Sequence, residues 1–290
     1  MTTKFDRSAQ DVGNIAALEH VNVRVPSQQV ATAFYVVGLG FTRDPYLMVG
    51  LENMWINIGQ QQFHLPTGGP QVVRGRIGLV VPDLEALMAR LASAKEALTG
   101  TAFDYGVDNG YVAVTCPWGN RLRFHAPGPE FPYMTLGMPY VEFPVPRGSA
   151  AGIARFYETA MGAPAPVVEQ GGAATAMVCV GRTQRLIFRE TDAALAAYDG
   201  HHVAIYISNF SSPHRWLESH GLITEESDPY QYRFTKIVDP KTGNLLFEIE
   251  HEVRSLTHPM YLRPLISRNP AQRQRTYAPG RDPFMPGQGA

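Results

Sequence analysis

The chain has 290 residues, 44% of them hydrophobic, so it is long enough to bury one or two substantial cores. A net charge of −1 and a pI of about 6.8 exclude a global attraction to nucleic acid or to an anionic membrane. The expected partner is a small molecule or a second copy of the chain in a homo-oligomer. Cys116 and Cys179 are the only cysteines, too few for a disulfide framework. Residues 1–14 lack an apolar signal core, and no run of about 18 apolar residues follows, which predicts a soluble, cytoplasmic protein.

A strand with a histidine on one face opens the regular part of the chain. In residues 18–25, LEHVNVRV, alternation places His20 on one face and a row of valines on the other. The pattern returns in HVAIYI, which begins at His202. Two further copies, RIGLVV and YVEFPV, carry Arg76 and Tyr140 at the histidine position. These four strands predict a four-fold internal repeat.

The first two repeats each combine one strand, one helix and further strands. In the first, Ser27 is the expected N-cap of a helix that ends near residues 38–40, and strands are expected over 46–50, 53–59 and 61–66. In the second, a strand from residue 76 is followed by a helix over 83–98 and by strands over 110–114 and 120–124.

The last two repeats follow the same plan. The third has a strand over 140–145, a helix over 148–162 and strands near 174–180 and 184–189. The fourth has the strand over 202–207, a helix capped by Ser211 or Ser212, and strands near 230–238 and 245–252.

The composition also predicts where the domains divide. Residues 1–15 are expected to form a flexible arm, and the proline- and glycine-rich segment 128–137 a linker. We expect an N-terminal domain of two units over 16–127, a C-terminal domain of two units over 138–253, and an extended tail over 254–290.

Three features together resemble the vicinal oxygen chelate superfamily over residues 18–252. They are the βαβββ unit of about fifty residues, a Phe-Tyr pair before the glycine that ends two of the helices, and a D-P-x-x-G-N turn before the last strand. This superfamily includes glyoxalase I, type I extradiol ring-cleaving dioxygenases and antibiotic resistance proteins. The resemblance implies an α+β fold in which four βαβββ modules form two cupped mixed sheets. It also implies metal ligands from the first and last strands of the units.

Aligning the last strands by their Phe-x or Leu-x pairs assigns residues to this pattern. If unit one pairs with unit four, as in fused glyoxalases, the expected ligands of a divalent ion (Fe, Zn, Mn, Ni or Co) are His20, His64, His202 and Glu248. Glu248 and Glu250, on one face of the last strand, are the candidate catalytic bases. Glu252 is expected to be solvated.

The remaining assignments concern substrate binding. Pairing unit two with unit three would gather Arg76, Arg123, Arg189 and Tyr140 into a pocket for an anion, or into a degenerate site. Tyr206, on the histidine face of its strand, is a further substrate-binding candidate.

Three functions remain open on this evidence. The first is a metalloenzyme with glyoxalase-like isomerase or lyase chemistry, in which the ion chelates neighbouring oxygens of a small substrate. The second is an Fe(II) ring-cleaving dioxygenase, which requires unit one to pair with unit two and unit three with unit four, and Tyr140 departs from its expected histidine. The third is a binding or resistance protein without catalysis. The paired histidines favour an enzyme.

Overall fold

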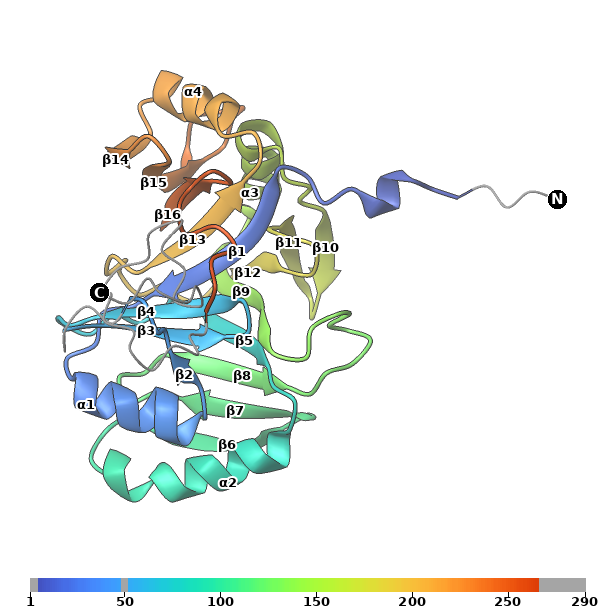
Figure 1. The fold of residues 1–290 in the computed structure, drawn as a ribbon. Helices are drawn as coiled ribbons and strands as arrows, with labels where there is room; N and C mark the ends of the chain where they lie inside the picture. The colour runs from blue at the N-terminus through green and yellow to red at the C-terminus, as the bar shows by residue number, and fades with distance from the viewer. Residues whose placement is uncertain (1–4, 48–51, 266–290) are drawn as a thin grey trace, which may run out of the picture.

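The computed structural model describes residues 5–47 and 52–265. Sixteen strands in this part form two mixed sheets of eight strands each, and none of its helices is long and apolar enough to span a bilayer. In Figure 1 the N-terminal arm, which carries the short helix η1 (Ser8–Gln10), projects away from the sheets. The predicted α+β class is confirmed.

The first sheet has the order β14-β15-β16-β13-β1-β4-β3-β2. It therefore combines the first and fourth units. At its centre β1 pairs antiparallel with β13, while β4 and β16 run parallel to β1 and β13. Its strands are β1 (Ile15–Asn22), β2 (Thr42–Arg43), β3 (Asn53–Ile58), β4 (Gln61–Pro66), β13 (His202–Ile207), β14 (Ile223–Asp228), β15 (Gln231–Val238) and β16 (Leu245–Ser255).

The second sheet has the order β10-β11-β12-β9-β5-β8-β7-β6, from the second and third units. Its centre repeats the plan of the first, with β5 antiparallel to β9, β8 parallel to β5 and β12 parallel to β9. Its strands are β5 (Arg76–Val80), β6 (Asp104–Asp108), β7 (Tyr111–Thr115), β8 (Arg121–His125), β9 (Gly137–Pro146), β10 (Val167–Gln170), β11 (Ala173–Cys179) and β12 (Arg185–Thr191).

One helix follows the first strand of each unit. Two of the four continue into π-helical segments, η2 and η4, near Gly40 and Gly162, and this shared irregularity supports duplication of the unit. The helices are α1 (Gln28–Ala31) with η2 (Thr32–Gly38), α2 (Leu84–Ala94) with η3 (Glu96–Leu98), α3 (Ala150–Phe156) with η4 (Tyr157–Met161), and α4 (Ser211–Ser219).

The helices and one face of each sheet share a single apolar core. Val21, Phe63 and Val203 of the first sheet are buried in it, as are Ile77 and Phe143 of the second. Because side chains alternate along a strand, the polar residues between them lie on the opposite face of each sheet. We call that opposite face the open face.

The strand order settles how the units pair. Of the two arrangements that the sequence left open, unit one pairs with unit four and unit two with unit three. Each sheet therefore takes one unit from either side of residues 128–137, so this segment does not separate the two sheets. A proline- and glycine-rich composition marks a chain segment that leaves regular structure, whichever sheet the chain enters next.

Some predictions of local structure are confirmed and others are wrong. Ser27 caps α1 as predicted, its hydroxyl accepting from the Val30 N–H. The predicted serine cap of α4 was wrong, because the Asn209 carboxamide oxygen accepts from the Ser212 N–H instead. The strand predicted at 46–50 lies partly outside the described residues, and the edge strand is Thr42–Arg43. Three other edge strands, β6, β10 and β14, were missed because they are largely exposed and lack apolar alternation.

The last described residues return across the first sheet. β16 continues to Ser255, so Arg254 belongs to this strand and not to the predicted tail. Farther on, the Arg263 guanidinium lies 2.6 Å from the Asp44 carboxylate, and both side chains are at most 1% exposed. Gln62 contacts both partners, donating to Asp44 and accepting from Arg263.

This buried ion pair generates a stability prediction. Arg263→Met leaves the Asp44 carboxylate buried without its cation and should lower the free energy of unfolding by about 3–5 kcal/mol. The matched control is Arg147→Met, which removes the same charge from an exposed pair with Asp192 and should have no measurable effect. Urea unfolding measures both. Equal midpoints for the two variants would contradict a structural role for Arg263.

Candidate metal centre

Three imidazoles meet on the open face of the first sheet. Each residue offers one ligand nitrogen, and these atoms from His20, His64 and His202 all lie within 4.8 Å of one another. The pairing register explains why they meet. Asn22 stands opposite His202 on β13 and opposite His64 on β4, and His20 lies two residues before Asn22 on β1. His20 is fully buried and His202 is 6% exposed.

Each imidazole has one nitrogen held by an oxygen. His20 Nδ1 lies 2.9 Å from a Glu19 carboxylate oxygen, and His64 Nε2 lies 2.7 Å from the Asn53 carboxamide oxygen. His202 Nδ1 lies 3.2 Å from Glu250 Oε1. Since the Glu19 and Asn53 oxygens accept, His20 Nδ1 and His64 Nε2 donate, and the other nitrogen of each of these two rings presents a lone pair. Carboxylate or amide partners of this kind orient histidine ligands in metal sites.

The surroundings keep two of these imidazoles neutral. Burial, reinforced by the neighbouring His20, lowers the pKa of His64 to about 2, and burial likewise holds the pKa of His202 well below its ordinary value. The Trp55 indole stacks on His64 with ring centroids 3.9 Å apart and fixes the plane of that ring. Neutral imidazole is the form that binds metal ions.

The carboxylate beside the unpartnered nitrogen of His202 is that of Glu252, not that of the predicted ligand Glu248. Glu252 Oε2 lies 3.5 Å from His202 Nε2, and Glu252 is 3% exposed, contrary to its predicted solvation. Within the described residues Glu248 forms no ion pair with the three histidines, and its backbone carbonyl accepts a hydrogen bond from Arg74.

The pairing register shows why the sequence alignment pointed to Glu248 instead of Glu252. On β13, His202 stands opposite Glu250 and Ala204 opposite Glu252, while on β1 the residue two positions after His20 stands opposite His64. Glu252 is therefore the counterpart of His64. Aligning Phe247 with Phe63 placed the ligand four residues too early, an even shift that leaves the face of the strand unchanged.

Glu250, predicted as a catalytic base, borders the cluster. Its carboxylate contacts His202 Nδ1 and accepts from Arg233 at 2.7 Å. Burial raises the pKa of Glu250, against the opposing attraction of Arg233. At 24% exposure its side chain can still be reached from outside.

Three charged residues of the cluster were not predicted from the sequence. Arg254 Nη1 lies 2.6 Å from Glu19 and the same guanidinium contacts Glu252, while Arg233 Nη2 lies 2.5 Å from Glu252. Burial alone would raise the pKa of Glu19, but Arg254 and His20 lower it to about 2. With Glu250, three carboxylates face two guanidinium groups, an arrangement that favours an additional cation.

A β-bulge brings Glu19 into this position. The pairing of β1 with β13 shifts register between Leu18 and His20, so that Leu18 and Val21 both reach the core while Glu19 and His20 both lie on the open face. Strict alternation would have sent Glu19 into the core. Bulges commonly re-aim side chains beside functional sites.

The donor set suits a divalent metal ion. His20 Nε2 and His202 Nε2 are buried and have no hydrogen-bond partner within the described residues. Buried polar atoms normally find a partner, so these lone pairs are available to a cation. Three imidazoles and one carboxylate are ligands that Zn, Fe, Ni, Mn and Co accept, and ligand atoms of such an ion lie about 3–4 Å apart when each bond is about 2.1 Å.

A cavity of about 480 Å³ lies beside Glu19, the carboxylate that contacts His20, although none of the three histidines lines it. Glu19 and Gln62 line it from the sheet, and Met260 and Arg263 line it from the returning chain. Tyr206, the predicted substrate-binding residue, also lines it and donates its hydroxyl to Glu19 at 3.2 Å. This volume can accommodate a small organic molecule.

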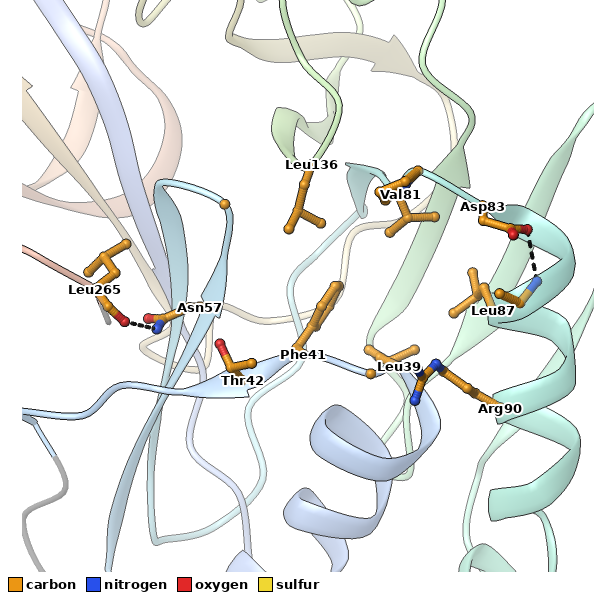
Figure 2. Close-up of a pocket in the computed structure, with 14 residues that line it drawn as sticks. Leu39, Phe41, Thr42, Asn57, Val81, Asp83, Leu87, Arg90, Leu136 and Leu265 are labelled. Carbon is orange, nitrogen blue, oxygen red and sulfur yellow. Dashed lines mark hydrogen bonds between the residues drawn. The ribbon is translucent and has the colours of Figure 1, made fainter. Parts of the chain in front are cut away.

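Figure 2 shows residues that line another cavity, which has a volume of about 420 Å³. Phe41, Leu87 and Leu136 give it an apolar wall, with Arg90 of α2 at its side. None of the three histidines or their carboxylate partners lines it. We therefore place the candidate chemistry at the histidine cluster.

The other predicted residues lie on the open face of the second sheet. Tyr140 and Arg123 both stand opposite Gly78, and Arg76 lies on the same central strand. Arg189 stands on β12 opposite Pro144 and comes within 3.6 Å of Glu142. The structure thus brings these four residues together, on a different sheet from the histidines.

Comparisons with known proteins match the fold. No protein-family model and no curated protein matches the sequence. Among solved structures, glyoxalase I from Zea mays has a TM-score of 0.59 at 15% identity, covering 83% of this chain and 92% of that one. A putative dioxygenase from Bacillus subtilis has a TM-score of 0.56 at 16% identity, covering 84% and 86%. With four βαβββ units in two paired sheets, this chain has the fold of the vicinal oxygen chelate superfamily.

Proposed function

We propose that this protein is a metal-dependent enzyme that binds a small substrate through two neighbouring oxygens and carries out glyoxalase-like isomerase or lyase chemistry. The observation that carries the proposal is the cluster of three imidazoles within 4.8 Å, two of them with buried, unpartnered nitrogens. We assign the fourth ligand to Glu252 because it is the register counterpart of His64.

The residues around the cluster supply the rest of the chemistry. When bound, a divalent ion would act as a Lewis acid that stabilises the negative charge developing on two adjacent substrate oxygens. Four protein ligands leave two positions on a six-coordinate ion, which matches a bidentate substrate. Glu250 can accept a proton from the substrate at its carboxylate, and Arg233 holds that carboxylate in place. Tyr206 and Gln62 line the cavity in which the substrate would lie.

The ring-cleaving alternative loses its predicted site. That site required unit three to pair with unit four, so that Tyr140, at the position expected for a histidine, would lie beside His202. The structure places Tyr140 and His202 in different sheets. The likeness to a putative dioxygenase is one of fold, and the four-ligand count favours chemistry without a third open position.

The ligand assignment predicts the effect of two matched substitutions. Protein purified without chelator should hold close to one divalent ion per chain, and Glu252→Gln should weaken metal affinity at least roughly 100-fold, since a ligand is worth no less than its supporting partners. Glu248→Gln, four residues earlier on the same strand, should leave metal affinity unchanged. Elemental analysis and competition with a chelator measure both. Metal loss in Glu248→Gln alone would restore the original assignment.

Asn53 should act through His64. Asn53→Ala removes the oxygen that orients the ring and should weaken metal affinity roughly 10- to 100-fold. Asn57→Ala, the same change four residues along β3, is the control and should bind metal normally, because Asn57 contacts Gln62 and the Leu265 carbonyl but no histidine. Chelator competition that cannot tell the two variants apart would argue against an orienting role.

Glu250 tests the reaction itself. Glu250→Gln should retain the ion yet lower kcat by roughly 10²- to 10⁴-fold, because the substitution removes a proton acceptor. Turnover would be followed over a panel of α-hydroxycarbonyl compounds, with catechols and oxygen uptake assayed in parallel. Full activity in this variant would remove Glu250 from the mechanism, and cleavage of catechols would favour the dioxygenase alternative.

A further inference from the structure

The open face of the second sheet carries guanidinium groups where the first sheet carries imidazoles. β5 pairs with β9 as β1 pairs with β13, so Arg76 and Tyr140 occupy the positions of His20 and His202. Arg123 stands opposite Gly78 as His64 stands opposite Asn22. The same backbone plan therefore presents positive side chains in place of metal ligands.

Unused N–H donors remain on Arg76, Arg123 and Arg189. Within the described residues, Arg76 and Arg189 have one charged neighbour, Glu142, whose Oε1 is 3.6 Å from the Nε of each. This separation is too long for a direct hydrogen bond. Arg189 Nε is buried without a hydrogen-bond partner. In the part of the chain that the structure describes, Arg123 forms no hydrogen bond or ion pair, and its guanidinium carbon lies 4.5 Å from the centre of the Tyr111 ring.

The charge balance of this face is positive. Within the described residues Glu142, whose side chain is 9% exposed, is the only carboxylate that forms an ion pair with Arg76, Arg123 or Arg189. Around the three histidines, by contrast, the carboxylates of Glu19, Glu250 and Glu252 outnumber the guanidinium groups of Arg233 and Arg254. Arg76 and Arg189 remain about one-third exposed, so a solute can reach them. An anion would complete this arrangement as a cation completes the other.

Tyr140 prevents this face from holding a metal ion at the position equivalent to the histidine cluster of the first sheet. Its ring lies against Gly78, where a Cβ would come within 2.2 Å of it, so the ring occupies the space in front of the central strand. Its hydroxyl pairs with His125 at 2.9 Å, and burial raises its pKa, which keeps the phenol neutral. A neutral phenol can donate to an anion.

We propose that the open face of the second sheet is an anion-binding site that takes a small molecule through a carboxylate or phosphate group held by Arg76, Arg123 and Arg189. Glu142 spaces the guanidinium groups and competes with the ligand for them. The site is separate from the metal centre and does not depend on the function proposed for it.

Isothermal titration calorimetry tests this proposal on the full-length protein at fixed ionic strength. The probes are inorganic phosphate and succinate, which separate a phosphate site from a carboxylate site. Arg76→Gln and Arg189→Gln should each weaken binding roughly tenfold, the value of one charge-assisted hydrogen bond. Arg147→Gln, which removes the same charge from an exposed pair, should leave affinity unchanged.

Glu142→Gln provides a prediction of opposite sign. Removing the competing carboxylate while keeping its shape should tighten anion binding several-fold, a result that general damage to the fold would not produce. His20→Ala should bind the anion normally even when it has lost metal. The proposal is overturned if neither probe binds up to about 10 mM, or if Arg76→Gln and Arg189→Gln bind as tightly as the control Arg147→Gln.

Discussion

The antiparallel pairing of β1 with β13 is the interaction on which the candidate metal centre depends. It joins the first and fourth units at the middle of one sheet and sets His20 next to the strand that carries His202. The parallel neighbours β4 and β16 then add His64 and Glu252. Because these four side chains come from the first and fourth units, they meet only when the complete first sheet has formed. Folding and construction of the site are therefore one event.

Much of this arrangement could be predicted from the sequence, because alternation fixes the face of a strand on which each side chain lies. It identified the three histidines that the structure brings together and the four units, and it gave the pairing of the first and fourth units as one of two possible arrangements. Alternation has a period of two, however, so Glu248, Glu250 and Glu252 are equivalent by pattern. Only the hydrogen-bonded register distinguishes them, and this register depends on contacts with β13, far away in sequence.

Specific structural features explain why some residues and strands were not predicted. Glu19 reaches the site through a β-bulge, which breaks the alternation on which the sequence reading relied. Arg254 was assigned to a tail because its segment lacks periodicity, yet it lies on the last strand and pairs with Glu19. The edge strands escaped because exposed strands carry few apolar residues. The two open faces show that one backbone plan supports opposite charge, carboxylates with imidazoles on one sheet and arginines on the other.

The central claim is that one divalent ion lies among imidazoles from the first unit and an imidazole and carboxylate from the fourth. Anomalous diffraction from crystals of the metal-loaded protein, collected on both sides of the absorption edge of the metal, locates such an ion directly. The account predicts a single peak bonded to His20, His64, His202 and Glu252. A peak elsewhere on the molecule, or the absence of any peak among these four side chains, would contradict it.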